Sequence, residues 1–247
     1  MSLLKFFLIK LIKKIPCKYI LSCINLFTKV TLYKSIVNIK SLGFEIKVIY
    51  DIGAHKGKWS RDLNAQFPEM KFYLFEANDS HKKDLNKLPY WNHIGVLSNI
   101  EKDVYFYSNK NQTGDSYFKE STYAYQDTLA KKLKSQTLDS VIYNKKLPLP
   151  DFIKIDTQGS ELDILNGAKN CLKNARMLLL ECPIYPYNLG GPKLSDYVNY
   201  LLDFNFYPSR LIEIHDMAGM LVQIDILFMN EELMYKSNIN FKKFYLK

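Results

Sequence analysis

The stretch that decides the fold is "VIYDIGAHKGKWS", residues 48–60. An apolar run ends at Asp51, Gly53 and Gly57 bracket a short turn, and a helix-like pattern follows. Glycines let the backbone approach a ligand closely, and the first N–H groups of the following helix then face that ligand. The stretch therefore predicts a strand, a turn and a helix that cradle a small molecule.

Strands and helices continue to alternate after this stretch. Further strands are expected at 70–78, 91–99, 152–156, 175–183, 207–214 and 220–229, and helices at 57–67, 80–88, 160–172 and 196–206. Asp79 or Ser80 is expected to cap the second helix, and Ser195 the last. Residues 101–150 are less regular and include an expected hairpin, "DVYFYSNKNQTGDSYF" (103–118). The alternation, with consecutive fully apolar strands, predicts an α/β fold with a mostly parallel sheet and helices on both faces.

The ends of the predicted strands carry acids. Asp51, Glu76, Asp156 and Glu181 each lie at such an end, and Ser98–Asn99 follow another strand. Ligands of open parallel sheets bind beyond the carboxyl ends of the strands. The four acids are therefore expected to converge on one rim, where Glu76 accepts hydrogen bonds from the two hydroxyls of a ribose.

The order of residues in the glycine turn separates two classes of cofactor. A dinucleotide fold has three glycines, G-x-G-x-x-G, around a pyrophosphate. Here the pattern is D-I-G-A-H-K-G, in which the acid Asp51 comes directly before the glycine loop. That acid repels a pyrophosphate and attracts a cation. S-adenosylmethionine carries an ammonium, a sulfonium and a ribose, so it is favoured over NAD. An NAD-dependent oxidoreductase remains the alternative.

Composition narrows the possible partners and the compartment. The 247 residues carry a formal charge of +9, but only three of the basic residues are arginines, which bidentate recognition of bases and phosphates favours. We therefore expect no nucleic-acid partner. We attribute the positive net charge to the high lysine content of the chain. The four cysteines form no CxxC pair and no Cys/His cluster with zinc spacing, so no metal site is predicted and a reducing cytoplasm fits best.

Residues 1–43 are expected to form a basic, helical N-terminal extension that ends at Gly43, before a main domain at 44–247. Lysines interrupt the apolar residues of 1–30 too often for a membrane span, and no signal-peptide cleavage site follows. The segment either packs its apolar face on the main domain, which we favour, or lies on an anionic membrane surface. The second possibility leaves open a non-catalytic, membrane-surface module, or an enzyme peripheral to the inner face of the membrane.

Between residues 46 and 182 the chain resembles the FkbM-type methyltransferases, within the class I S-adenosylmethionine-dependent group. The matching pieces are "YDIGAHKGKWS", "YLFEAN", "GVLSN", "QTLDSV", "DFIKIDTQGSELDILNGA" and "LLLEC", among which "IKIDTQGSE" is the most specific. The resemblance implies a Rossmann-like, seven-stranded sheet whose final hairpin carries the one antiparallel strand. It also implies methyl transfer to an oxygen, commonly on a sugar or a secondary metabolite.

The resemblance also assigns the cofactor site. It implies a methionine end near Asp51, Gly53, Ala54, His55 and Gly57, a ribose at Glu76 beside Ala77, and an adenine bordered by Leu97, Ser98 and Asn99. Asp156 lies near the transferring methyl. For His55 we expect a loop-positioning role and no chemistry.

The candidate general bases are Asp156, Glu161, Glu181 and His215, because an alcohol must lose its proton during methyl transfer. Asp156 is the first choice, with cofactor orientation alone as its alternative. Glu161 either contacts substrate or complements a helix N-terminus, and Glu181 is either structural or helps Asp156 to hold a metal. The hairpin insertion within 101–150 and "CPIYPYNLGGPKLS" (182–195) flank the expected mouth, and their polar side chains suit a hydroxylated acceptor, a sugar or glycan that is free or lipid-linked.

Overall fold

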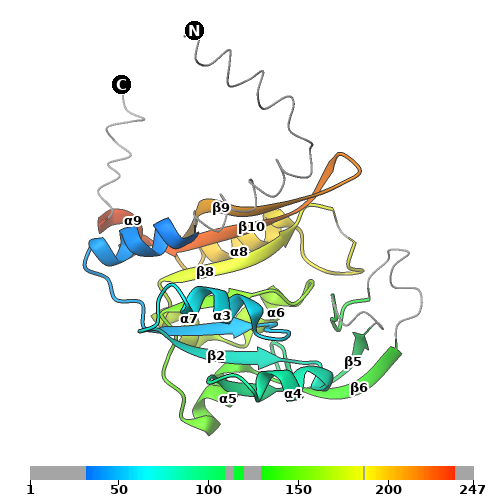
Figure 1. Cartoon of the computed structure of the whole chain (residues 1–247). Helices are drawn as coiled ribbons and strands as arrows, with labels where there is room; N and C mark the ends of the chain where they lie inside the picture. The colour runs from blue at the N-terminus through cyan, green and yellow to red at the C-terminus, as the bar shows by residue number, and fades with distance from the viewer. Residues whose placement is uncertain (1–31, 109–113, 120–128, 186, 237–247) are drawn as a thin grey trace, which may run out of the picture.

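The computed structural model describes residues 32–108, 114–119, 129–185 and 187–236. Its centre is a seven-stranded sheet in the order β3-β2-β1-β7-β8-β10-β9. β1 (Val48–Ile52) pairs in parallel with β2 (Lys71–Glu76) and β7 (Phe152–Ile155), β2 pairs with β3 (Trp91–Ile94), and β7 with β8 (Met177–Pro183). β10 (Met220–Asn230) runs antiparallel to both β8 and β9 (Phe206–Met217). The predicted sheet, with one antiparallel strand in the final hairpin, is confirmed (Figure 1).

Helices cover both faces of this sheet, because successive strand residues point to opposite sides. Tyr50, Ile153 and Leu178 pack against α5 (Leu138–Lys145), α6 (Glu161–Asn166), α7 (Lys169–Asn174) and α8 (Leu194–Leu202). Ile49 and Phe152, one residue away along their strands, belong to the opposite core with α3 (Lys58–Asn64), α4 (Lys82–Leu85), α9 (Glu231–Lys236) and the helix at 32–41. The predicted layers, with helices on both faces, are therefore present.

The helix at 32–41 belongs to this second core although it precedes the expected main domain. Leu32, Ile36 and Ile39 are buried against the sheet, and the chain turns at Gly43, where φ is +85°. Residues 1–31 lie outside the described residues. The choice between core packing and membrane contact concerns this segment. Among those described, no helix combines the length and apolarity that crossing a membrane demands.

A second, three-stranded sheet has the order β4-β6-β5. It contains β4 (Val96–Leu97), β5 (Asp103–Ser108) and β6 (Leu129–Gln136), and it lies below the carboxyl side of the main sheet in Figure 1. The sequence did not predict β6, because "LAKKLKSQ" lacks the apolar alternation of a strand. The expected hairpin at 103–118 is represented by one bridge, Tyr107 to Ser116, whereas β5 pairs along its length with β6.

Several predicted boundaries are wrong in ways that the structure explains. The strand expected at 91–99 divides at Gly95, where β3 leaves the main sheet and β4 joins the small one. The helix expected after Gly159 divides at Gly167, the C-cap of α6, into α6 and α7. This position requires glycine, because a side chain there would lie 2.2 Å from the Ser98 carbonyl oxygen.

Two predicted helix caps also differ. The Asn78 side chain accepts the Ser80 N–H in place of a cap from Asp79 or Ser80, and Ser195 lies inside α8, which Lys193 precedes. Cys171 and Cys182 are buried free thiols.

Candidate functional site

A cavity of about 360 Å³ opens beyond the carboxyl ends of β1, β2 and β7. Its lining comes from the glycine turn, from the residues that follow β2 and β7, from the small sheet and from the segment 114–117. Six of the predicted site residues line it: Gly53, His55, Glu76, Ala77, Leu97 and Asp156. Five predicted cofactor residues do not line it: Asp51, Ala54, Gly57, Ser98 and Asn99.

The glycine turn is fixed by contacts with its neighbours. The backbone N–H groups of Gly53 and Ala54 both donate to the Phe75 carbonyl oxygen, at 2.9 and 3.0 Å. At Gly53, with φ of +77°, an added Cβ would lie 1.8 Å from the Asp156 carbonyl oxygen. At Gly57 it would meet the Leu88 side chain at 2.4 Å, so this glycine is required by core packing and not by approach to a ligand.

Glu76, the last residue of β2, presents a buried carboxylate to the cavity. Its Oε2 accepts the His55 N–H at 2.6 Å and its Oε1 accepts the Asn78 N–H at 2.8 Å. Burial raises the pKa of Glu76, and these backbone donors only partly offset that effect. The turn at residue 55, where φ is +50°, therefore aims one backbone donor at this acid.

Lys154 connects two of the predicted acids. This nearly buried residue lies on β7, with its Nζ 3.3 Å from Asp51 Oδ1 and 3.2 Å from Asp156 Oδ2. Asp51 is wholly buried within β1, in register with Lys154, and its Oδ2 accepts the Ser60 hydroxyl at 2.6 Å. The expectation that Asp51 faces the cofactor needs correction, because its carboxylate is held by Lys154 and Ser60 beneath the turn.

Asp156 follows β7 and is the one proposed base that lines the cavity. Its side chain is 43% exposed. Burial alone would raise its pKa, but the Lys154 ammonium and hydrogen bonds involving Glu181, Lys154 and Gln158 outweigh burial and hold it below the usual range. Asp156 is therefore ionised at neutral pH and is a weak base.

Glu161 is buried and stabilises the turn that follows Asp156. It begins α6, is fully buried, and does not line the cavity. Its carboxylate accepts the backbone N–H groups of Thr157 and Gly159 and, at 2.6 Å, the Tyr197 hydroxyl. The prediction that Glu161 contacts substrate is thus not supported, since these donors occupy its carboxylate and fix the turn after Asp156.

Glu181 is buried behind this turn on β8 and does not reach the cavity lining either. Gln158 Nε2 donates to both of its carboxylate oxygens at 2.8 Å, and lies 3.4 Å from Asp156 Oδ1. Burial and the neighbouring charge of Asp156 raise the pKa of Glu181 well above its usual value. Gln158, which sequence reasoning missed although it lies inside "IKIDTQGSE", joins the two acids.

His215 lies on β9, away from the cavity lining. Its Nε2 is 3.4 Å from Asp225 Oδ1, and this acid raises the pKa of the imidazole. The structure therefore brings His215 to a second cluster of side chains rather than to the proposed base position.

The adenine border differs by a few residues from the expectation. Gly95, Val96 and Leu97 line the cavity, whereas Ser98 is fully buried and its hydroxyl contacts Asn99 Oδ1 and the Tyr117 hydroxyl. The correction arises because β4 ends at Leu97 and the chain then turns away.

The segment 114–117 also lines the cavity, and it falls within the polar stretch expected at the mouth. Asn78 Nδ2 donates to Asp115 Oδ2 at 2.6 Å, and the Tyr117 hydroxyl donates to Asp163 Oδ2 at 2.8 Å. The Leu189 N–H donates to the Lys119 carbonyl oxygen at 2.9 Å, which joins this segment to the second polar stretch.

The sheet order, the turn after β1 and the acid at the end of β2 define a Rossmann-like methyltransferase of class I. The Methyltransferase FkbM domain family matches residues 51–207, and the chain belongs to that family. It is thus an S-adenosylmethionine-dependent methyltransferase, as the resemblance implied.

Comparisons with other proteins add weak similarities. A precorrin-6y C5,15-methyltransferase from Geobacter metallireducens is 14% identical, with a TM-score of 0.44, and 79% of this chain and 87% of that chain are covered. The magnesium protoporphyrin IX methyltransferase of Synechocystis, with bound S-adenosylmethionine, is 12% identical, with 84% and 79% covered and a TM-score of 0.47. A putative tRNA (m1A22) methyltransferase of Streptococcus pneumoniae is 12% identical, with 87% and 79% covered and a TM-score of 0.42. No curated protein matches the sequence.

Proposed function

We propose that the cavity binds S-adenosylmethionine and that the chain transfers its methyl group to a hydroxyl of a sugar or glycan. The main support for this cofactor site is the buried carboxylate of Glu76, which lines the cavity at the end of β2. Backbone donors from His55 and Asn78 hold each of its oxygens in place. A carboxylate fixed in this way accepts hydrogen bonds from the two hydroxyls of a ribose without reorganisation.

The other residues that line the cavity support one orientation of the cofactor within it. With the ribose at Glu76, the apolar residues Phe75, Val96 and Leu97 suit the adenine. The methionine end then lies at the turn of Gly53 and His55, beside Asp156. In this arrangement the cationic ammonium and sulfonium approach the ionised Asp156, so the acid before the glycine turn is not required to face them.

Asp156 is proposed to accept the proton of the acceptor hydroxyl. The acceptor oxygen attacks the methyl carbon in line with the carbon–sulfur bond, whose electrons return to sulfur, so correct orientation supplies much of the rate. Lys154 keeps Asp156 ionised and ready to accept a hydrogen bond from the hydroxyl. Gln158 and Lys154 both act as positioning residues, because they hold Asp156 from two sides.

Two polar segments support a hydroxylated acceptor. Residues 114–119 and 187–191 meet at the hydrogen bond between Lys119 and Leu189, and Asp115 and Ser116 line the cavity. Hydroxyl and carboxylate groups have lone pairs for further hydrogen bonds from sugar hydroxyls.

Mass spectrometry of the purified protein tests the cofactor. Bound S-adenosylmethionine or its demethylated product is expected, whereas a bound nicotinamide would support the oxidoreductase alternative. The acceptor is tested by incubating the protein with methyl-labelled S-adenosylmethionine and a panel of nucleotide sugars, oligosaccharides and lipid-linked glycans. Label on a sugar hydroxyl is expected. Label only on RNA or on a porphyrin-like compound would contradict the acceptor class.

We place the enzyme in the cytoplasm and propose that residues 1–30 contact the inner face of the membrane. The lysines and apolar residues of that segment suit an anionic surface. Co-sedimentation with vesicles of anionic phospholipid at low salt tests this contact. A protein that stays in the supernatant would contradict it and leave the methyltransferase proposal unaffected.

A further inference from the structure

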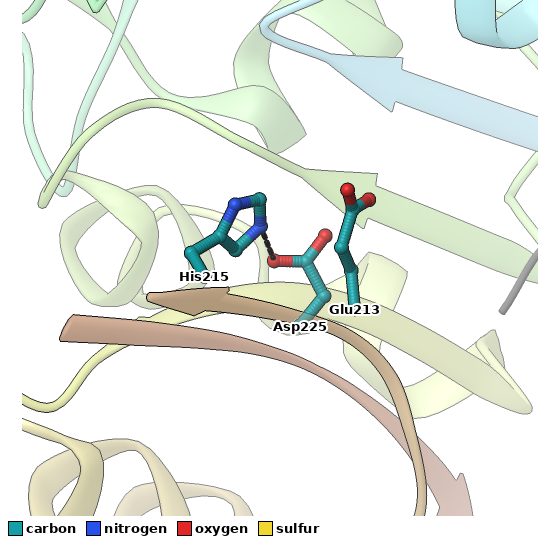
Figure 2. Close-up of side chains that lie close together, drawn as sticks. All are labelled: Glu213, His215 and Asp225. Atoms are coloured by element: carbon teal, nitrogen blue, oxygen red, sulfur yellow. Dashed lines mark ion pairs between the residues drawn. The ribbon is translucent and has the colours of Figure 1, made fainter. Parts of the chain in front are cut away.

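A cluster of three possible metal ligands lies on the final hairpin. Glu213 and His215 are two residues apart on β9 and share a face, and Asp225 on β10 is in register with Glu213. One ligand atom from each of the three lies within 4.8 Å of the others. Figure 2 shows the side chains above the hairpin, with the imidazole directed at the Asp225 carboxylate and Glu213 beside it.

The spacing suits coordination better than direct pairing. His215 Nε2 and Asp225 Oδ1 are 3.4 Å apart, longer than the roughly 2.7–2.9 Å of a charge-assisted hydrogen bond. Two ligands on a tetrahedral ion with bonds of about 2.1 Å lie about 3.4 Å apart. Asp225 Oδ1 is buried and accepts no hydrogen bond within the described part of the chain. A cation between the two groups would satisfy this oxygen.

The lysines and arginines of the described residues do not pair with the acids of the cluster. Asp225 is in register with Glu181 on β8, so three carboxylates gather at this end of β8, β9 and β10. Lys154, on β7, already lies between Asp51 and Asp156. Within the described ranges, no lysine or arginine forms an ion pair with Glu181, Glu213 or Asp225.

We propose that Glu213, His215 and Asp225 bind one divalent transition-metal cation, Mn²⁺ or Zn²⁺. Two carboxylates and one imidazole are a mixed donor set, which suits these ions better than Mg²⁺ or Ca²⁺, whose usual ligands are all oxygens. Water would complete the coordination.

A role for the ion follows if the proposed function holds. Glu181 connects the cluster to Gln158 and so to the cavity. The three ligands lie outside the cavity lining, so the cation would not touch the acceptor. It would instead balance the charge of Glu181 and so support the Gln158 contact that positions Asp156. The O–H bond breaks toward Asp156, the oxygen–methyl bond forms, and the methyl–sulfur bond breaks with its electrons on sulfur.

The full chain, stripped with chelator, is titrated with MnCl₂ while electron paramagnetic resonance counts the free ion. One bound Mn²⁺ per chain is expected, and Glu213→Gln and Asp225→Asn should each weaken binding at least tenfold. Glu101→Gln, which changes an exposed acid away from the hairpin, is the control and should bind as the wild type does. Absence of stoichiometric binding, or equal binding by all variants, would overturn the site.

Pulsed electron paramagnetic resonance of the wild-type protein tests the histidine ligand without any variant. Coupling of bound Mn²⁺ to an imidazole nitrogen is expected, and its absence would contradict ligation by His215. Calorimetry with S-adenosylmethionine on the same preparation separates the two proposals. If the protein binds Mn²⁺ but not S-adenosylmethionine, the metal site stands and the proposed function is wrong. If methyl transfer is unchanged after chelation, the ion has no role in catalysis.

Discussion

Glu76 is the residue on which cofactor binding depends most directly in the proposed site. Replacement by Gln keeps the size but puts an amide nitrogen where a carboxylate oxygen accepts a backbone N–H from His55 or Asn78. Loss of a charged hydrogen-bond acceptor costs about 1.5–3 kcal/mol, so calorimetry should show S-adenosylmethionine affinity reduced about tenfold or more. Unchanged affinity would mean that the ribose lies elsewhere. Glu101→Gln serves as the control.

The same residue makes cofactor affinity depend on pH. Burial raises the pKa of Glu76 above the usual 4.5, and the ionised form is the one that accepts both ribose hydroxyls. As pH falls through this raised pKa, Glu76 gains a proton, so affinity should decline at a higher pH than for an ordinary glutamate. Calorimetry between pH 5 and 8 measures the decline, which should be weaker in Glu76→Gln. A decline of equal size in the variant would assign it to another group.

Asp156 is expected to affect turnover more than cofactor binding. Asp156→Asn should leave S-adenosylmethionine affinity within about tenfold and reduce kcat by about 10² or more, the scale of general-base catalysis. Asp203→Asn, at an exposed position after α8, is the control. A folded Asp156→Asn enzyme with normal kcat would restrict this residue to orienting the cofactor.

Sequence reasoning found the strand ends but not the direction of each side chain. Glu76 and Asp156 were placed correctly at the cavity, because they end or follow their strands. Asp51 precedes the end of β1 by one residue, and its side chain therefore points to the sheet face that carries Lys154. The positions of Asp51 and Lys154 depend on the register between β1 and β7, which no local pattern encodes.

At the scale of elements, the turn between β7 and α6 shows why "IKIDTQGSE" is specific. Lys154 holds Asp156, Gln158 joins Asp156 to Glu181, and Glu161 binds the backbone of the turn. Gln158 has a φ of +56°, a conformation that is uncommon for a residue other than glycine. Lys154, Gln158 and Glu161 thus each help to fix the turn that carries Asp156.

Glu161 is expected to contribute stability and not chemistry. Glu161→Gln would turn an amide toward the N–H donors of Thr157 and Gly159 and leave one of them unpaired. The free energy of unfolding should fall by about 1–3 kcal/mol, as measured by urea denaturation, while Glu101→Gln changes it little. A variant with wild-type stability but lost activity would return Glu161 to the list of candidate bases.

The elements that were missed have weak local patterns. β6 is rich in lysine and pairs with β5 and β4, which lie far from it in sequence. α5 has few apolar residues apart from its buried Leu138, Val141 and Ile142. Both are stabilised by tertiary contacts, which override local propensity. β7 and β8 of the main sheet were found more readily, because they are mostly apolar and are buried throughout.

For the whole molecule, the folded unit begins before the family match. The match covers residues 51–207, whereas the helix at 32–41 contributes Leu32, Ile36 and Ile39 to the core on one face of the sheet. The chain division predicted at residue 43 therefore does not separate this helix from the packing of the main domain. Its apolar face occupies the same layer as α3.

This docking predicts unequal effects of two neighbouring substitutions. Ile36 is fully buried and Val37 is 38% exposed. Ile36→Ala leaves a cavity and should lower the free energy of unfolding by about 2–5 kcal/mol, while Val37→Ala, measured in the same urea titration, should change it by about 0.5 kcal/mol or less. Because the helix lies away from the cavity lining, both folded variants should bind S-adenosylmethionine normally. Equal, small losses would mean that residues 32–41 do not pack on the sheet in solution. The folded domain would then begin near the start of the family match, at residue 51.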